Sequence, residues 1–430
     1  MTRLLLPYIL AMSGCVSSQP TYYSHIQPIM EARCVQCHAS EQIGGFSLAE
    51  YSDVQEWSGP VLSAVSNGTM PPWPAAEGPA YKNDWSLTEE QVQMISEWID
   101  RGMPEGNPDA QRIEVTRLQQ DLEQVDAVLQ MNEAYQPDSA QTDDYRCFVL
   151  DWESAETEYV TGFQPRPGNP KLVHHIAAYL FRPDTLLGDS VFTQLQAWED
   201  ESPGYGYPCY GGPAGPTGNL QVPIQQLAQW VPGNSGQRLP LNSGVEVPPG
   251  SAVVLQLHYF PDASEPDATD LTSIEFTTAP KVDQIGGFAP WLDPSWPLGG
   301  MEIPAGKEGI MHIADGDPRS FFEFLNPGMD LTHGFTIHSA MLHMHELGKE
   351  GEVSIRRQTG EYEPLLTIPQ WDFNWQLTYH LAEPVEFIPG DNLFLSCSFS
   401  NTGENAMDTA WGESTQEEMC VSNLFITPLP

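Results

Sequence analysis

The sequence predicts a mainly β protein in which two packed antiparallel β-sandwiches follow a small all-α domain. The 39 prolines and 36 glycines imply many turns, and most of the chain after residue 140 consists of short alternating segments. In the stretch 251–259, for example, Val253, Leu255 and Leu257 share one face of a strand. Near the N-terminus, by contrast, apolar residues recur at helical spacing on both sides of a Cys-x-x-Cys-His motif.

Length and charge limit the classes of function. The 430 residues are enough for three domains that each bury a core. The 58 acidic and 17 basic residues give a formal net charge of −41, which excludes a nucleic-acid or anionic-lipid surface. Such a charge is typical of a protein that stays soluble in a saline or extracellular medium.

Residues 1–19 resemble a bacterial lipoprotein signal peptide and tether. One positive charge and a short apolar run precede small residues and Cys15. The apolar run is too short to span a bilayer, so we expect an export signal rather than a membrane helix. After cleavage Cys15 would be the lipidated first residue, which would anchor the protein on the periplasmic or cell-surface face of a bacterial membrane.

Residues 20–106 are predicted to form a cytochrome c-like haem domain around the motif Cys-Val-Gln-Cys-His. In c-type haem attachment, Cys34 and Cys37 would bond the vinyl groups and His38 would reach the iron. The alternative is a zinc-binding or redox Cys-x-x-Cys pair. Helical spacing before the motif and over residues 87–102 resembles the first and last helices of a class I cytochrome c.

Met70 is expected to be the sixth ligand of the haem iron. It lies in the stretch Asn-Gly-Thr-Met-Pro-Pro-Trp-Pro, where prolines would stiffen a loop that can hold a thioether on the iron. His25 is the alternative ligand, and a methionine in the core is the structural alternative. A methionine ligand would raise the haem potential compared with two histidines.

Residues 107–140 are expected to link the haem domain to the two sandwiches, which would occupy residues 141–280 and 281–430. Leu118 and Leu122 begin a helical spacing in the linker, but its polar remainder fits an extended strap along the next domain equally well.

The cysteines outside the haem motif and the signal predict two disulfides. Four remain, namely Cys147, Cys209, Cys397 and Cys420. Four cysteines allow three pairings. Because two of them lie in each half of the later chain, we favour Cys147 with Cys209 and Cys397 with Cys420.

Histidines cluster at spacings that are typical of metal ligands. His343 and His345 are two residues apart, so a strand would project both from one face, although a lone pair of this kind is more often exposed or hydrogen-bonded. Other motifs add His174, His175, His258 and Met419. Imidazole suits copper, zinc or iron, and a thioether added to two imidazoles favours copper, particularly Cu(I). The sequence therefore predicts two copper sites.

The order of these motifs is itself informative: His-His, Leu-His-Tyr, His-x-His with Leu-Gly-Lys after it, and Glu-Met-Cys. Over residues 140–430 it resembles the copper type II, ascorbate-dependent monooxygenases. The resemblance implies two jelly-roll-like sandwiches with one copper each. It implies an electron-storing copper and an oxygen-binding copper, whose ligands would be His174, His175 and His258, and His343, His345 and Met419, respectively.

If the resemblance holds, one strand must be irregular. The sequence also differs from the peptidylglycine enzymes at positions that bear on the substrate. The neighbours His174 and His175 should point to opposite faces of a regular strand, so a shared ion requires a local twist or bulge. Met341 stands where the peptidylglycine enzymes of the family have an arginine that holds the substrate carboxylate. Val421 and Asn423 likewise replace an asparagine and a tyrosine, so we do not expect a C-terminal glycine substrate.

The remaining histidines have weaker predicted roles. His338 is a candidate for a supporting or substrate contact near His343, with a structural role as the alternative. We expect structural roles for His312, His333 and His380.

The predicted function is that of an exported copper-dependent monooxygenase that hydroxylates a C–H bond of a small organic substrate with O2. Electrons would come through the fused c-type haem from an electron donor protein or a small reductant, and no nucleic acid would take part. One alternative is a non-catalytic, membrane-tethered cytochrome and copper-binding module. Another is an electron-transfer protein that serves a separate oxidase.

Overall fold

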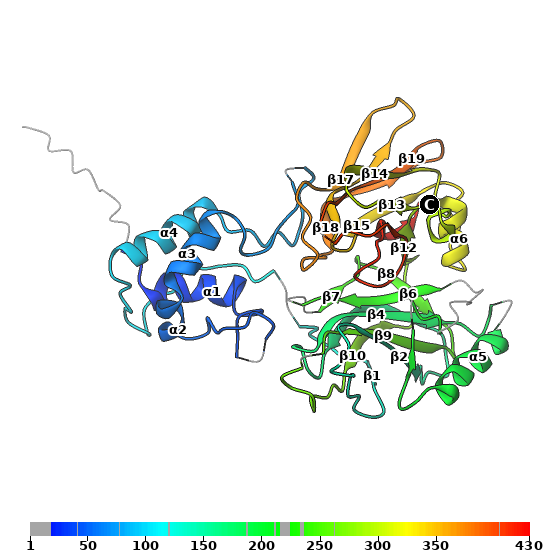
Figure 1. Cartoon of the computed structure of the whole chain (residues 1–430), viewed down its shortest axis with the longest axis horizontal. Coiled ribbons are helices and arrows are strands. Elements are labelled where there is room, and N and C mark those ends of the chain that lie inside the picture. The colour runs from blue at the N-terminus through cyan, green and yellow to red at the C-terminus, as the bar shows by residue number, and fades with distance from the viewer. Residues whose placement is uncertain are drawn as a thin grey trace, which may run out of the picture.

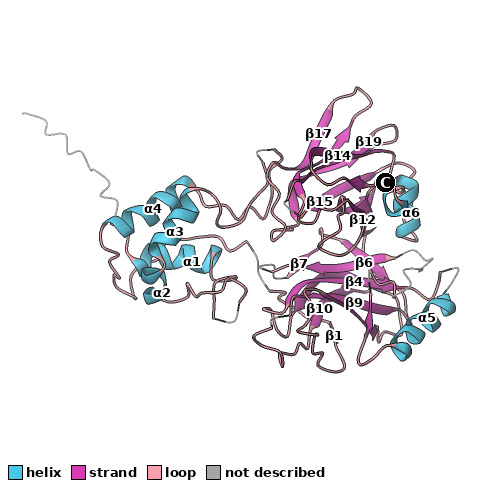
Figure 2. Ribbon diagram, in the orientation of Figure 1, coloured by secondary structure: helices cyan, strands magenta, loops and turns pink. Residues whose placement is uncertain are grey.

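The computed structural model describes residues 19–430, apart from 41, 77, 119–120, 186–187, 210–211, 216–223, 233–235, 262 and 404. Strands dominate these residues (Figure 1), and helices gather in the N-terminal part of the chain, as Figure 2 shows. The prediction of a mainly β protein with antiparallel sheets is confirmed. Cys15 and the rest of residues 1–18 lie outside the described residues, so the predicted signal and lipid anchor stay predictions.

The helical part of the chain begins with η1 and ends with α4. Its elements are η1 (Tyr22–Ile26), α1 (Gln27–Arg33), α2 (Tyr51–Glu56), α3 (Ser58–Ser66) and α4 (Glu89–Asp100). The helices expected before the Cys-x-x-Cys-His motif and within residues 87–102 are both present. Thr88 caps α4 in a capping box with Gln91. Ile26, Ile29 and Trp98 are at most 1% exposed and form the centre of this part's own core.

The first two large sheets enclose a second core. One sheet has the order β1 (Ala127–Gln130), β10 (Ser273–Ala279), β3 (Glu158–Arg166), β8 (Ser243–Val247) and β11 (Gln284–Ile285), with β7 (Gln237–Arg238) beside β3. The other has the order β5 (Tyr207–Pro208), β2 (Asp144–Asp151), β9 (Ala252–Tyr259), β4 (Val173–Phe181) and β6 (Gln225–Trp230). Phe163 from the first sheet and Leu255 from the second belong to the core they share.

Strand β1 lies inside the segment that was predicted to be a linker. It pairs with β10, so the sheet begins before residue 141. The described part of residues 107–140 contains no helix, so the extended alternative describes this segment and the helical one does not.

The next two large sheets enclose a third core. One has the order β12 (Gly287–Trp291), β21 (Val421–Pro428), β15 (Phe335–His343) and β18 (Tyr379–Phe387), and the other has the order β14 (Lys307–Gly316), β19 (Asn392–Asn401), β16 (Gly348–Arg356) and β17 (Tyr362–Ile368). A small pair, β13 (Glu302–Ile303) and β20 (Thr409–Ala410), accompanies them, as do the short helices η2 (Trp296–Leu298) and α6 (Arg319–Leu325). Helix α5 (Gly188–Glu201) follows β4 in the first pair of sheets.

The second and third cores are connected by side chains that cross between the pairs of sheets. Phe288 of β12 and Phe425 of β21 pack in the second core although their strands belong to the third. In Figure 1 the two pairs of sheets accordingly lie one above the other. Residues between them are therefore held by both.

An extended segment between α3 and α4 ties the helical part to strand β18. The backbone N–H of Lys82 donates to His380 O at 2.8 Å, and the N–H of Ala382 donates to Ala80 O at 2.8 Å. The ring of Trp73 packs against that of Tyr379, with 4.8 Å between centroids. The helical part is thus anchored to the strand-rich body by backbone hydrogen bonds and apolar contacts.

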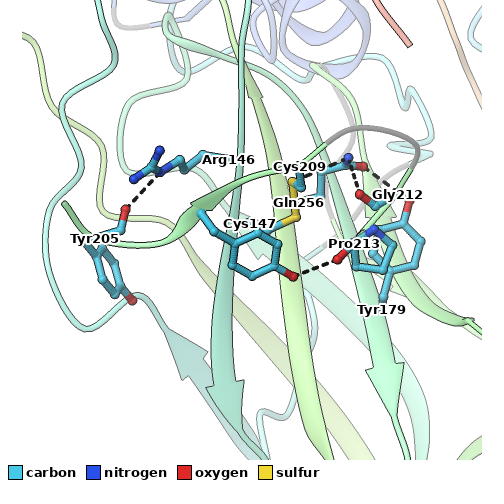
Figure 3. The surroundings of a disulfide bond; sticks show 9 residues. Arg146, Cys147, Tyr179, Tyr205, Cys209, Gly212, Pro213 and Gln256 are labelled. Atoms are coloured by element: carbon cyan, nitrogen blue, oxygen red, sulfur yellow. Dashed lines mark hydrogen bonds between the residues drawn. A yellow bond between two sulfur atoms is a disulfide. The ribbon is translucent and has the colours of Figure 1, made fainter. Parts of the chain in front are cut away.

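Both predicted disulfides are present, Cys147–Cys209 and Cys397–Cys420. Figure 3 shows the first, which joins β2 to the chain after β5. Beside it the Arg146 guanidinium donates to Tyr205 O at 3.0 Å, and the Gln256 amide donates to Gly212 O at 3.0 Å (Figure 3). These bonds hold the chain on either side of Cys209 against β2 and β9. None of the helices in the described residues is long and apolar enough to cross a membrane.

Removing the second disulfide should destabilise the pair of sheets that contains β21. Cys397 and Cys420 are 23 residues apart, and cross-linking a loop of this length stabilises a fold by about 3 kcal/mol. We expect Cys397→Ala/Cys420→Ala to lower the unfolding temperature in calorimetry. The matched variant Cys147→Ala/Cys209→Ala opens a longer loop and should cost at least as much, and an unchanged unfolding profile in the first variant would contradict the expectation.

Candidate metal centre

Strands β4 and β9 bring the first three predicted copper ligands together. His174 and His175 lie near the start of β4, and the two strands pair so that His175 stands opposite His258. The register of this pairing shifts between Val173 and His175. The bulge predicted from the need for two neighbouring histidines to share an ion is therefore present at the required place.

The three imidazoles converge through their Nδ1 atoms. The Nδ1 atom of His258 lies 3.3 Å from that of His174 and 3.3 Å from that of His175, and the third separation is 3.4 Å. Three nitrogens bound to one ion at about 2.0–2.1 Å in tetrahedral geometry lie about 3.3–3.4 Å apart. The triangle has the size that a single bound metal ion requires.

Burial keeps these imidazoles neutral. It lowers the pKa of His174 to about 4, and it holds the pKa values of His175 and His258 well below their ordinary value, with the neighbouring histidines lowering them further. Neutral imidazole is the form that binds a metal. Their lone pairs are therefore available at neutral pH.

Asp143 fixes the orientation of His258. The Nε2 atom of His258 donates to Asp143 Oδ1 at 2.8 Å, so the proton is on Nε2 and the lone pair of Nδ1 faces the other two histidines. The second oxygen of Asp143 accepts a hydrogen bond from the Thr415 hydroxyl at 3.0 Å. One carboxylate thus connects this cluster to the chain just before β21.

The second cluster presents the opposite ring nitrogens. The Nε2 atoms of His343 and His345 lie 3.2 Å apart. The Nδ1 atom of His345 donates to Glu417 O at 3.0 Å, and that of His343 donates to the Gln376 side-chain oxygen. Burial lowers the pKa of His343 to about 3 and also lowers that of His345. Both Nε2 lone pairs therefore point at one position.

Glu418 connects His345 to Met419. Its buried carboxylate accepts the backbone N–H of His345 at 2.9 Å and that of Met419 at 3.3 Å. Burial raises the pKa of this carboxyl to about 7. Cys420 points into the third core, where its disulfide fixes the end of the segment. Met419 is held on the other side, 6% exposed, in the cavity described next.

A cavity of about 370 Å³ joins the two clusters. Its lining includes His175 of the first, together with His343 and Met419 of the second. The wall is largely apolar, with Trp230, Phe321 and other hydrophobic side chains and a few amides. Such a lining is typical of a site for a small organic molecule.

The residues of the predicted haem site line a separate cavity of about 540 Å³. Cys34, Cys37, His38 and Met70 all contribute to its wall. Cys34 and Cys37 are not joined in a disulfide, and burial raises the pKa values of their thiols to about 12 and about 11.

Two further details concern the candidate histidine ligands beside this cavity. The Nδ1 atom of His38 is buried without a hydrogen-bond partner, and a Cβ at Gly44 would lie 2.4 Å from it, so only glycine leaves the ring room. His25, the alternative iron ligand, is outside the wall, and its Nδ1 accepts the backbone N–H of Thr21 at 3.2 Å. Met70 lies in the wall of this cavity, and its role as the sixth ligand stays a prediction.

The other histidines lie away from the two clusters. His312 bonds to Glu302 O at 3.1 Å, and His338 bonds to the Thr427 hydroxyl at 2.9 Å. His338 and His380 line a different cavity, beside Lys82. Structural roles for His312 and His380 stay predictions, as does a structural role for His338.

Sequence reasoning missed the residues that orient the ligands: Asp143, Gln376 and Glu418. An acidic residue directly before β2 and a second glutamate in Glu-Glu-Met-Cys were the available signals. Gln376 has no local signal, because its position beside His343 comes from folding alone.

Comparisons with known proteins agree with this geometry. Residues 326–427 match the profile of the copper type II ascorbate-dependent monooxygenase C-terminal domain. This part of the chain is similar to such a domain. The matched region contains His343, His345 and Met419, the three residues predicted to hold the oxygen-binding copper.

Relatives extend the similarity beyond that domain. DBH-like monooxygenase protein 1 of the mouse is 28% identical over 267 residues, which is 61% of this chain and 40% of the relative. The chicken protein of the same name is 27% identical over 64% of this chain and 42% of its own. Dog dopamine beta-hydroxylase is 33% identical over 95 residues, 22% of this chain and 15% of that enzyme. The chain thus spans about two fifths of the length of the mouse and chicken relatives.

Asp143→Ala should weaken copper binding at the first cluster. Without the carboxylate His258 loses the partner that fixes its tautomer, and losing such a partner typically costs about 10–100-fold in metal affinity. Competition titration with a Cu(II) chelator would measure the loss. Asp144→Ala is the matched control, because its carboxylate bonds to the Tyr135 hydroxyl instead; equal affinities in the two variants would contradict the role of Asp143.

Proposed function

We propose that this protein is a copper-dependent monooxygenase that hydroxylates a C–H bond of a small organic substrate. The observation that carries the proposal is the arrangement of the two neutral histidine clusters. They present Nδ1 and Nε2 lone pairs at two positions beside one largely apolar cavity. The similarity of residues 326–427 to the C-terminal domain of the copper type II ascorbate-dependent monooxygenases supports it, and so do the DBH-like relatives.

The chain's own residues divide the work. His174, His175 and His258 would hold one copper, and His343, His345 and Met419 would hold the other, where the thioether favours Cu(I). Bound copper would supply O2 activation and one-electron redox chemistry. Each turnover would consume one O2, two electrons and two protons, and would release one water with the hydroxylated product.

The cavity limits the substrate. Among the described residues that line it, none is lysine or arginine, and Met341 occupies the wall near His343. A carboxylate buried there would have no cation to pair with, which is costly in a largely apolar site. The proposed substrate is therefore a neutral or cationic small molecule, with its polar groups directed at amides such as Gln229 and Asn423.

A c-type haem in the 540 Å³ cavity is the proposed electron supply. Cys34 and Cys37 would attach it, and His38 and Met70 would bind the iron. An electron donor protein or a small reductant would reduce it.

Two jelly-roll-like sandwiches would form the copper-binding part of the protein. We also propose that the protein is exported and held at a membrane by a lipid anchor at Cys15. The two disulfides favour an oxidising compartment.

Labelled oxygen tests the proposed activity against the non-catalytic alternatives. With 18O2, candidate neutral or amine substrates and a reductant, the copper-loaded protein should give a product that carries one 18O atom. Mass spectrometry measures this directly, and the copper-free protein is the control. Reductant oxidation without any oxygenated product, across substrates that fit the cavity, would favour an electron-transfer module instead.

Met419→Ile should separate copper binding from turnover. The first cluster lacks this sulfur, so its copper should remain, whereas Cu(I) affinity at His343 and His345 and the rate of hydroxylation should fall at least tenfold because the soft ligand is lost. Met341→Ile makes the same change in the same cavity without touching a proposed ligand, and its copper affinity should match that of the unaltered protein. Equal Cu(I) affinities in both variants would remove Met419 from the ligand set.

A further inference from the structure

One loop contacts all three proposed cofactor sites. It is the stretch Trp371–Gln376, Trp-Asp-Phe-Asn-Trp-Gln, between β17 and β18. At its first residue, the Trp371 indole N–H donates to His345 O at 3.0 Å. At its last, the Gln376 side-chain oxygen accepts from His343 Nδ1. Both ends of the loop are therefore bonded to the second histidine cluster.

The middle of the loop lies between the two clusters. The Phe373 ring stacks on His174, with centroids 5.3 Å apart and planes at 21°. The same ring meets His345 edge-on at 6.1 Å and 89°. Phe373 therefore contacts one ligand of each cluster, and the Gln376 amide fixes it by donating to Phe373 O at 2.9 Å.

The remaining part of the loop closes the haem cavity. Asn374 and Trp375 line that cavity together with Cys34 and Met70 from the helical part of the chain. His174 lines it as well. A single histidine of the first cluster thus belongs both to the three-nitrogen triangle and to the wall of the haem cavity.

Several hydrogen bonds attach the segment after Met70 to the strand that follows the loop. The segment that follows Met70 is bonded to β18, the strand directly after the loop, through Lys82 and Ala80. Asn83 adds two more bonds there, from its amide to Thr378 O at 2.9 Å and from the His380 N–H at 3.0 Å. The loop and the haem-cavity residues therefore share one rigid attachment.

We propose that electrons pass from the haem cavity to the first copper site through His174. The Trp371–Gln376 loop, with Trp375 against the haem cavity, keeps that cavity packed against His174. The inference rests on the proposed function. In the step, haem Fe(II) is oxidised to Fe(III) and Cu(II) at His174, His175 and His258 is reduced to Cu(I), with one electron transferred and no bond made or broken. Trp375 is a positioning residue, because it acts by packing the cavity against His174.

The test is a single electron transfer in the full chain that carries haem and copper. Under anaerobic conditions a flash-generated flavin semiquinone reduces the haem, and the haem absorbance then reports its reoxidation while freeze-quench EPR reports loss of Cu(II). We expect Trp375→Leu to slow reoxidation at least tenfold with haem and copper contents unchanged. Trp198→Leu makes the same change at a buried tryptophan of α5 that lines neither cavity, and its rate should stay within about twofold of that of the unaltered protein.

A second pair of variants keeps the test valid if Trp375→Leu loses a cofactor. His175→Ala should abolish rapid haem reoxidation because the first copper is lost, whereas His343→Ala, which loses the second copper, should retain it. The reverse pattern, or an unchanged rate in Trp375→Leu, overturns the route. Absence of covalent haem from the unaltered protein would overturn the electron supply itself, and a pyridine haemochrome assay distinguishes that failure from failure of the route.

Discussion

The site depends on burying five histidines beside one another without charge. Burial lowers the pKa of His174 to about 4 and that of His343 to about 3, and the other three imidazoles are lowered too. A protonated ring would repel its neighbours in a medium of low dielectric constant and would lose the lone pair that binds a metal. Neutrality is thus a condition for both the packing and the chemistry.

Each neutral imidazole still needs a hydrogen-bond acceptor for its one N–H group. Asp143, Gln376 and the Glu417 carbonyl accept the outward N–H groups of His258, His343 and His345. Each acceptor selects a tautomer, so the first cluster presents Nδ1 and the second presents Nε2. The acceptors come from different elements, and Asp143 also bonds to Thr415. Each acceptor lies in the same pair of sheets as its histidine but far from it in the chain, so the tautomers are set only when that pair of sheets has folded.

This dependence explains how far the sequence could predict the site. The ligand types, their order and the bulge at His175 follow from local patterns and from the resemblance, because residue spacing and strand geometry are local properties. The two disulfides and the helices that flank the Cys-x-x-Cys-His motif followed from cysteine positions and apolar spacing. By contrast, Gln376 is 33 positions from His343 and Asp143 is 115 from His258, and no local pattern records such contacts.

The start of the first sheet is a second feature that local sequence patterns do not record. Residues 127–130 read as part of a linker because four residues carry too little alternation to identify a strand. They become β1 through pairing with β10, more than 140 residues later. Edge strands of this kind are assigned by their partner rather than by their own sequence.

In the proposed function, the net charge and the haem cavity both affect how electrons reach the copper clusters. A net charge of −41 raises the barrier for small anionic reductants that approach the copper clusters, and it attracts basic electron-donor proteins. The haem cavity reaches His174 from the side of the helical part, which a protein donor can contact without entering the substrate cavity. Because the two cavities are separate, electrons and substrate would reach the first and second clusters by different paths, and reduction need not wait for product release.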